Sequence, residues 1–217
     1  MPLSNAPGIA ARSPYGAQYA FGARPPCYDN RPPSGRLPPR SEPVFLAVYP
    51  PPGLTPRIAR LAWHLRDKEG LRGMPIGQAR FHVTLHHIGE YADLLSEDID
   101  EISEAVAAIE MPPFRAALDY AMSFRHPERL PLVLRGDDGV AGLTMLQNQL
   151  VAALERIGFA RPRAPEFTPH LTLLYDKQRV REQAVEEISW TVNEVVLVRS
   201  LQRQSRHLPL ARWKLVA

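Results

Sequence analysis

Hydrophobic positions after residue 42 change period repeatedly, between the alternation typical of strands and the three-to-four spacing typical of helices. Residues 44–50 (VFLAVYP) form a short apolar, partly β-branched run closed by prolines, which predicts a buried strand. Helical spacing follows, with Thr55 placed as the N-cap, Pro56 at the first helical position and Gly70 as a stop. Residues 79–89 (ARFHVTLHHIG) alternate again and predict a second strand.

The rest of the chain continues this alternation of elements. Ser96 is predicted to cap a second helix that ends at residues 111–113 (MPP), and a third helix has apolar residues on one face from 143 to 157. Strand-like stretches lie at 114–124, 130–135, 167–175, 193–200 and 211–217, with residues 201–209 (LQRQSRHLP) as a hairpin connection. Several strands are joined too tightly for parallel crossovers, so the pattern predicts a mainly antiparallel α+β fold. Because the second half repeats the plan of the first, we expect two similar lobes.

Residues 1–42 differ in composition from the rest of the chain. They hold nine of the 23 prolines, with Gly, Ser, Asn and Arg between them and no apolar periodicity. Such a segment cannot bury enough apolar surface to join a core, so we interpret it as a disordered Pro/Arg-rich tail, with the folded domain over 43–217. It is either an extension without a selected role or a basic docking arm.

Charge and cysteine content narrow the function classes. The net charge of +3 comes from the tail, where five Arg stand against Asp29 and Glu42, while the remaining chain carries 21 basic and 21 acidic side chains. General capture of long polyanions is therefore disfavoured, and any anion site must be local. Cys27 is the only cysteine, which excludes an intramolecular disulfide and disfavours a thiolate zinc site. Without a membrane-length apolar run or a secretory signal, we expect a cytoplasmic protein with no membrane partner.

One short motif occurs twice in the predicted strands. FHVTL at 81–85 and PHLTL at 169–173 both place a threonine two positions after a histidine, with a leucine behind it. Side chains two apart on a strand share a face, so His82 projects with Thr84, and His170 projects with Thr172. Each copy thus presents an imidazole beside a hydroxyl.

Two such pairs facing each other across a cleft suit phosphodiester chemistry. Hydrolysis requires a proton taken from the nucleophile and another given to the leaving oxygen, and imidazoles exchange protons near neutral pH. Threonine hydroxyls can donate to the anionic oxygens. His82 and His86 have the spacing of metal ligands on a helix, but on a strand they lie roughly 13 Å apart, too far to bind one zinc. We therefore expect neither a metal nor another cofactor.

These motifs, in this order, resemble the two-histidine (2H) phosphoesterases, and within them the bacterial RNA 2′,3′-cyclic phosphodiesterases, also called 2′-5′ RNA ligases. The resemblance runs over residues 43–217 and includes RFHVTLHHIGEY, the PPF after the second helix, FTPHLTLLYDK and NEVVLVRS. It implies a bilobal fold with a central cleft, catalytic roles for His82 and His170, and contacts of Thr84 and Thr172 with the phosphate. It further implies that 2′,3′-cyclic phosphate ends of RNA or nucleotides are opened to 2′-phosphates, with His170 as base and His82 as acid, and that reverse 2′-5′ ligation is a candidate second activity.

One position departs from the family pattern. Some members carry an arginine five residues after the second motif histidine, where this sequence has Tyr175. A tyrosine donates a hydrogen bond but brings no positive charge, so it is at most an accessory phosphate ligand. His86, which strict alternation places on the face of His82 and Thr84, is the candidate to compensate when protonated; otherwise it is a polar residue at the rim.

Two other functions are compatible with the same residues. One is a phosphodiesterase for a small nucleotide, such as a cyclic phosphate of ADP-ribose or a 2′-5′ oligoadenylate. The other is a non-catalytic module that binds RNA ends; because both histidines and both threonines are intact, we favour an enzyme. The expected partners are RNA ends or small cyclic-phosphate nucleotides, and we expect the chain to act as a monomer.

Overall fold

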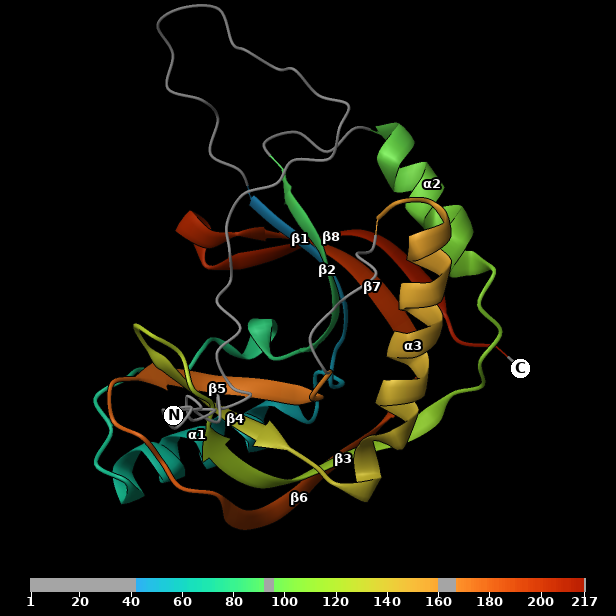
Figure 1. Ribbon diagram of the computed structural model, residues 1–217. Coiled ribbons are helices and arrows are strands. Elements are labelled where there is room, and N and C mark those ends of the chain that lie inside the picture. The colour runs from blue at the N-terminus through green and yellow to red at the C-terminus, as the bar shows by residue number, and fades with distance from the viewer. Residues whose placement is uncertain (1–41, 92–95, 160–166, 217) are drawn as a thin grey trace, which may run out of the picture. The chain divides into compact units, whose positions relative to one another are not determined.

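An eight-stranded antiparallel sheet organises the chain (Figure 1). The computed structural model describes residues 42–91, 96–159 and 167–216. The sheet has the strand order β6-β3-β4-β5-β2-β1-β7-β8. The strands span Glu42–Val48 (β1), Val83–Tyr91 (β2), Phe114–Ser123 (β3), Leu130–Arg135 (β4), His170–Asp176 (β5), Gln183–Val192 (β6), Glu194–Leu201 (β7) and Arg206–Lys214 (β8). With its helices, this sheet confirms the predicted antiparallel α+β fold.

The two strands that carry the repeated motif are neighbours at the centre of this sheet. β2 and β5 pair through one residue pair, Val83 and Leu171, whereas β1 pairs with β2, and β4 with β5, along most of their length. From β2 the sheet continues through β1, β7 and β8, and from β5 it continues through β4, β3 and β6. In strand order, the sheet therefore consists of two four-stranded halves that join at the motif.

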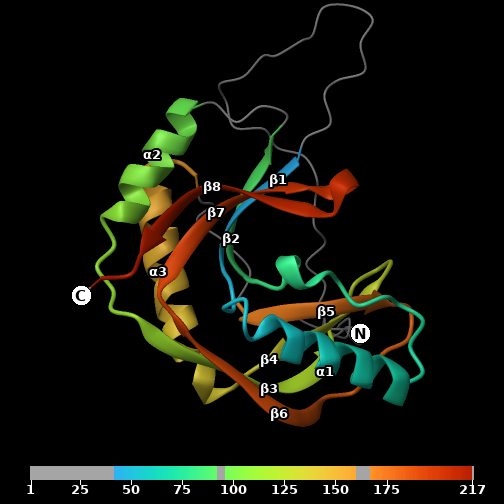
Figure 2. The same cartoon turned by 180° about the vertical axis from the view of Figure 1, so that it is seen from behind.

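Three helices pack on one face of the sheet: α1 (Thr55–Lys68), α2 (Ser96–Ala107) and α3 (Ala141–Arg156). Figure 2 shows α2 and α3 side by side, with α1 at the other half of the sheet, near β5. Buried residues of all three helices share one core with Leu46, Val83 and Leu171 of the sheet. On the opposite face of the sheet, Phe45 and Ala47 form a smaller apolar cluster with two valines of β7. No helix among the described residues is long and apolar enough to cross a membrane.

Local sequence signals account for most elements, with differences at their ends. α1 begins at Thr55, one residue before the predicted first helical position, Pro56. Leu54 is the N-cap residue, and the Thr55 hydroxyl donates to the Pro52 carbonyl at 3.0 Å instead of capping the helix. The apolar pattern gave no strand for β6, although Ile188, Trp190 and Val192 alternate there with polar residues.

The largest correction concerns the end of the chain. β8 starts at Arg206, so the final residues of the predicted loop 201–209 belong to a strand that pairs along β7. At the other end, β1 includes Glu42, which the composition assigned to the tail. The rest of the predicted disordered tail lies outside the described residues.

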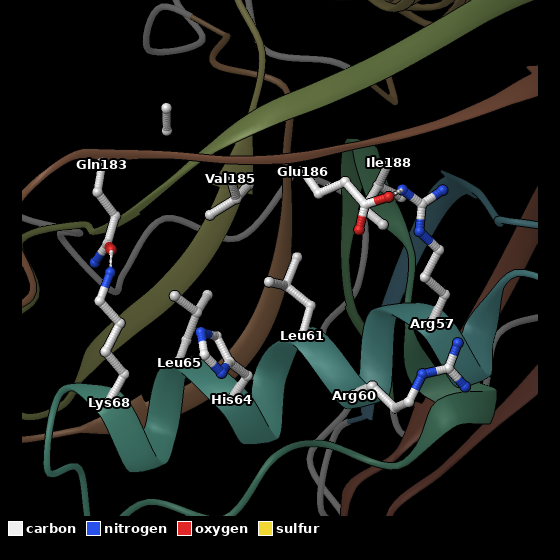
Figure 3. Close-up of a pocket in the computed structure, with 11 residues that line it drawn as sticks. Arg57, Arg60, Leu61, His64, Leu65, Lys68, Gln183, Val185, Glu186 and Ile188 are labelled. Carbon is white, nitrogen blue, oxygen red and sulfur yellow. Dashed lines mark hydrogen bonds and ion pairs between the residues drawn. The ribbon is translucent and has the colours of Figure 1, made fainter.

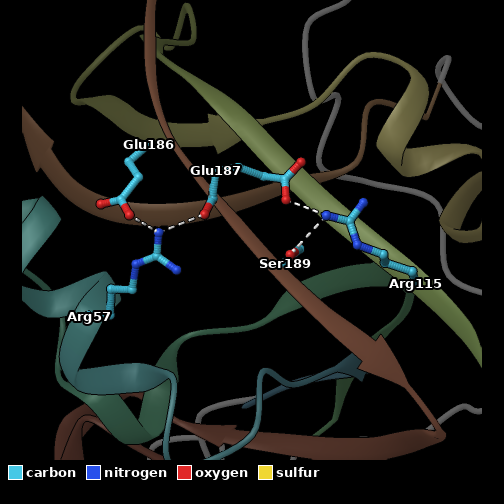
Figure 4. Close-up of polar contacts among 5 residues, drawn as sticks. All are labelled: Arg57, Arg115, Glu186, Glu187 and Ser189. Atoms are coloured by element: carbon cyan, nitrogen blue, oxygen red, sulfur yellow. Dashed lines mark hydrogen bonds and ion pairs between the residues drawn. The ribbon is translucent and has the colours of Figure 1, made fainter.

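Polar contacts tie α1 and β3 to the edge strand β6 (Figure 4). Arg57 of α1 donates to the carboxylate of Glu186 and, at 3.0 Å, to the carbonyl of Glu187. Arg115 of β3 pairs with the Glu187 carboxylate and donates to the Ser189 hydroxyl at 3.1 Å. These groups are largely exposed, so each pair contributes only about 0–1 kcal/mol, and their main effect is to align the edge strand.

The end of β5 is fixed by a carboxylate that accepts four backbone hydrogen bonds. Asp176 receives the N–H groups of Arg72 and Gly73 on one oxygen and those of Lys177 and Gln178 on the other, at 2.6–2.8 Å. Burial alone would raise the pKa of Asp176, but these donors outweigh it and lower the pKa. A Cβ at Gly73 would lie 2.1 Å from the Tyr175 carbonyl oxygen, so this close approach requires glycine.

We predict that Asp176→Asn lowers the free energy of unfolding by about 1–2 kcal/mol, because a neutral amide accepts fewer and weaker hydrogen bonds from the four N–H groups. Urea denaturation measures the change. Asp137→Asn is the matched control, since Asp137 makes an exposed ion pair with Arg135 and its loss should cost less than about 0.5 kcal/mol. Equal costs for the two variants would contradict the structural role of Asp176.

Candidate active site

The two motif histidines are tethered in the same way. His82 lies directly before β2, and its Nδ1 is 2.6 Å from the carbonyl oxygen of Arg80, two residues earlier. His170 opens β5, and its Nδ1 is 2.8 Å from the carbonyl oxygen of Thr168, again two residues earlier. A carbonyl only accepts, so Nδ1 donates in both rings. The neutral imidazoles are thereby held with an unprotonated Nε2, the nitrogen that can take up a proton.

The motif threonines lie on the same strand faces as the histidines. Thr84 pairs with Ala47 of β1, and Thr172 pairs with Val133 of β4, while Leu171 and other residues between them enter the main core. Both hydroxyls are partly exposed and make no hydrogen bond with the described residues. They are therefore free to donate to a ligand.

Burial keeps the imidazoles neutral in the absence of ligand. It lowers the pKa of His82 to about 4; the hydrogen bond to the Arg80 carbonyl opposes this shift, and the positive charges of His170 and Arg80 add to it. Burial also lowers the pKa of His170. Two neutral imidazoles near the Arg80 cation leave the site ready for an anion.

A bulge follows the motif in both strands. The β1–β2 register passes from Ala47–Thr84 to Leu46–His86, and the β4–β5 register passes from Val133–Thr172 to Leu132–Leu174. In each strand the leucine after the threonine, Leu85 or Leu173, has no partner across the pair. The bulge reverses the alternation, so the residue five positions after each histidine returns to the histidine face.

This bulge changes the place of both accessory candidates. His86 lies opposite Leu46, a core residue, and its Nε2 is 3.4 Å from the carbonyl oxygen of Phe159, behind α3. The strict alternation expected for His86 therefore fails, and it lies on the helix side of the sheet, where burial lowers its pKa. Tyr175 lies on the histidine face instead and is 42% exposed. The guanidinium carbon of Arg129, from the β3–β4 loop, lies 5.6 Å from the centre of its ring.

Aromatic rings form the wall behind each histidine, and the motif gave no indication of them. Phe45 stacks on His82 with 5.1 Å between ring centroids, and Phe124 lies 4.9 Å from His170. A third histidine, His207 of β8, packs edge-on against His82 at 4.9 Å, and its Nδ1 is 2.9 Å from the Tyr49 hydroxyl. The sequence pattern predicts a loop at His207 and therefore does not point to it; the signal for a strand is the alternation of the residues after Ser205.

A groove away from the motif residues lies beside α1. It has a volume of about 640 Å³ and runs between α1 and β6 on the helix-covered side, and none of the four motif residues lines it (Figure 3). Arg57 is held there by Glu186, and Lys68 donates to Gln183 at 2.6 Å. Among the described residues, no group of three or more His, Cys, Asp or Glu side chains is arranged to hold a metal ion.

Comparisons with known proteins show the family to which the chain belongs. A profile of the 2′-5′ RNA ligase superfamily matches residues 50–204. The chain therefore belongs to this superfamily, and the resemblance to two-histidine phosphoesterases is confirmed.

Individual relatives carry consistent names. The RNA 2′,3′-cyclic phosphodiesterase of Aeropyrum pernix is 35% identical over 120 residues, which cover 54% of this chain and 65% of that protein, just under two thirds of its length. The protein of the same name from Archaeoglobus fulgidus is 26% identical over 65% of this chain and 76% of its own. The crystal structure of E. coli LigT complexed with 3′-AMP has a TM-score of 0.66 and 27% identity, covering 82% of this chain and 99% of that one.

The lowered histidine pKa predicts that stability falls as the pH drops from 7 to 5. Unfolded His82 takes up a proton near its ordinary pKa of 6.5, whereas folded His82 does so only near 4, so protons favour the unfolded chain between these values. At pH 5 the cost for this ring is about 1–2 kcal/mol. Denaturation at both pH values should therefore give a smaller difference for His82→Phe than for the wild type. His64→Phe controls for the loss of one imidazole; an unchanged difference in His82→Phe would contradict the burial of His82.

Proposed function

We propose that this protein is a metal-independent phosphodiesterase that opens 2′,3′-cyclic phosphate ends of RNA or nucleotides to 2′-phosphates. The observation that carries the proposal is the matched tethering of His82 and His170, which leaves two Nε2 atoms available on adjacent strands. The names of the relatives agree with this substrate class. 2′-5′ ligation, in which a 5′ hydroxyl of a second strand takes the place of the attacking water and the two histidines keep their roles, is the second activity of this proposal.

In this proposal the two histidines act on opposite sides of phosphorus. His170 Nε2 takes a proton from the attacking water, whose oxygen forms the new bond to phosphorus. The bond from phosphorus to the 3′ oxygen breaks, and His82 gives that oxygen a proton. Thr84 and Thr172 donate to the non-bridging oxygens, where negative charge develops. The two halves of the sheet are the two lobes, and their shared face is the cleft.

Substrate binding must supply the acid. With a pKa of about 4, His82 is neutral near pH 7 in the free protein, so it cannot donate a proton before a ligand arrives. A phosphate anion between the rings favours their charged forms and raises both pKa values. Protonation of His82 therefore accompanies binding of the anionic substrate.

Arg129 and Tyr175 favour RNA over a small nucleotide in this proposal. Tyr175 lies five positions after His170, roughly 16 Å along an extended strand, so its backbone is well removed from that of His170. A chain that continues from the cyclic end along β5 would reach the exposed Tyr175 ring and the Arg129 guanidinium. That guanidinium makes no ion pair with the described residues, so its charge is available to a backbone phosphate of the RNA.

We predict that His82→Ala and His170→Ala each lower kcat by about 10² to 10⁴, because each removes a proton-transfer group. The assay is turnover of a cyclic nucleotide and of an oligonucleotide with a cyclic end, in EDTA, with products identified by phosphorus NMR. His64→Ala on α1 is the control and should retain wild-type activity. Retained turnover in either motif variant would overturn the mechanism. A 3′-phosphate product would reverse the assignment of the leaving oxygen, and binding without turnover in the wild type would favour the RNA-end binding module.

We predict that Arg129→Gln lowers kcat/KM for the oligonucleotide by about 5- to 30-fold, the worth of one charge-assisted contact. Turnover of the cyclic mononucleotide should change less than about 2-fold, since that substrate does not reach Tyr175. Arg125→Gln, in the same loop, is the matched control for charge. Equal losses for both substrates would contradict the subsite, and a wild type that prefers the small nucleotide would favour the alternative function.

A further inference from the structure

A third histidine lies in the site, and the proposed reaction does not use it. His207 belongs to β8, which follows both motif strands in the chain. Its ring nevertheless packs against His82 and Phe45, with centroids 4.9 and 5.4 Å away. Ser200, its partner across the β7–β8 pair, is buried, so the backbone at this position is fixed. An apolar ring would pack equally well here, and a polar one calls for another explanation.

The hydrogen bond with Tyr49 favours one of the two neutral forms of His207. The Tyr49 hydroxyl lies 2.9 Å from Nδ1. Burial raises the pKa of Tyr49, so the phenol keeps its proton, and among the described residues His207 Nδ1 is the one acceptor within its reach. Burial, together with the charges of His82 and Arg80, lowers the pKa of His207 to about 4, so the ring is neutral. A neutral imidazole that accepts at Nδ1 carries its proton on Nε2.

The Nε2–H group of His207 is unused within the protein. It makes no hydrogen bond with the described residues. Nor is it among the buried polar atoms that lack a partner, so solvent reaches it. His82 has the opposite arrangement, with the proton on Nδ1 and a free lone pair on Nε2. His82 thus presents an acceptor and His207 a donor, and in each ring the hydrogen bond at Nδ1 favours this form.

We propose that His207, oriented by Tyr49, is a substrate-binding residue whose Nε2–H donates to a non-bridging oxygen of the phosphate held between His82 and His170. The ligand chemistry, a phosphate group, rests on the proposed function. His207 lies on the His82 side of the site, where it complements the hydroxyl of Thr84. A neutral donor suits this place, because a second fixed cation beside His82 would oppose protonation of that ring.

Nitrogen NMR of the wild-type protein, labelled at histidine, tests this directly with inorganic phosphate as the probe. The free protein should show His207 with the proton on Nε2, and phosphate should shift the Nε2–H signal. His64, exposed on α1, should not respond. A proton on Nδ1, or a His207 signal unmoved by saturating phosphate, would overturn the proposal. Neither NMR measurement depends on turnover. A failure of the phosphodiesterase proposal can therefore be told apart from a failure of the His207 proposal.

Variants separate donation from packing. His207→Phe keeps a ring against His82 and Phe45 but removes the N–H, and it should weaken phosphate binding by roughly 10-fold or more. Tyr49→Phe removes the hydrogen bond that favours one tautomer of His207, and it should weaken phosphate binding by about 3-fold. The double variant should bind phosphate as weakly as His207→Phe, because both changes act on the same contact. His64→Phe is the matched control. Wild-type phosphate affinity in His207→Phe, with folding confirmed by its NMR spectrum, would reduce His207 to a packing residue.

Discussion

The pairing of β2 with β5 is the constraint on which the site depends. It consists of one residue pair, Val83 and Leu171, and each of these follows a motif histidine directly. Antiparallel pairing at this point brings residues far apart in the sequence side by side, and it fixes His82 and His170 on neighbouring backbones. The rest of the sheet extends outward from this pair, so the helices and the outer strands support an arrangement that is set at the centre.

The bulge after each motif has two effects on the strand. One unpaired residue allows the strand to keep two apolar side chains towards the core in succession, as Leu173 and Leu174 do. It also turns the fifth residue back to the open face. Because both strands carry this bulge, three positions of each strand face the open side of the sheet: the motif histidine, its threonine and the fifth residue after the histidine. The fifth residue is His87 in β2 and Tyr175 in β5.

The sequence was sufficient for parts of the molecule that depend on local periodicity. The helices, the motif strands and the pairing of each histidine with its threonine follow from alternation and repetition. His86 could not be placed, because a bulge reverses alternation without any marker such as glycine. His207 could not be found either: its role comes from the pairing of β8 with β7 and from contacts with Phe45, Tyr49 and His82, which only the tertiary fold brings together. The lowered pKa values likewise arise from burial.

The edge strands of a sheet carry unpaired backbone groups along one side, so the edges are where backbone hydrogen bonds are ordinarily missing. Here the seam with the fewest backbone bonds lies in the middle, and it is bridged from below by α3, which packs against β2 on one side of the seam and against β3 on the other. The apolar packing under the sheet thus supports the seam at the place where the ladder contributes a single residue pair. Buried residues of α3 that never meet a ligand therefore contribute to holding the backbones of His82 and His170 together.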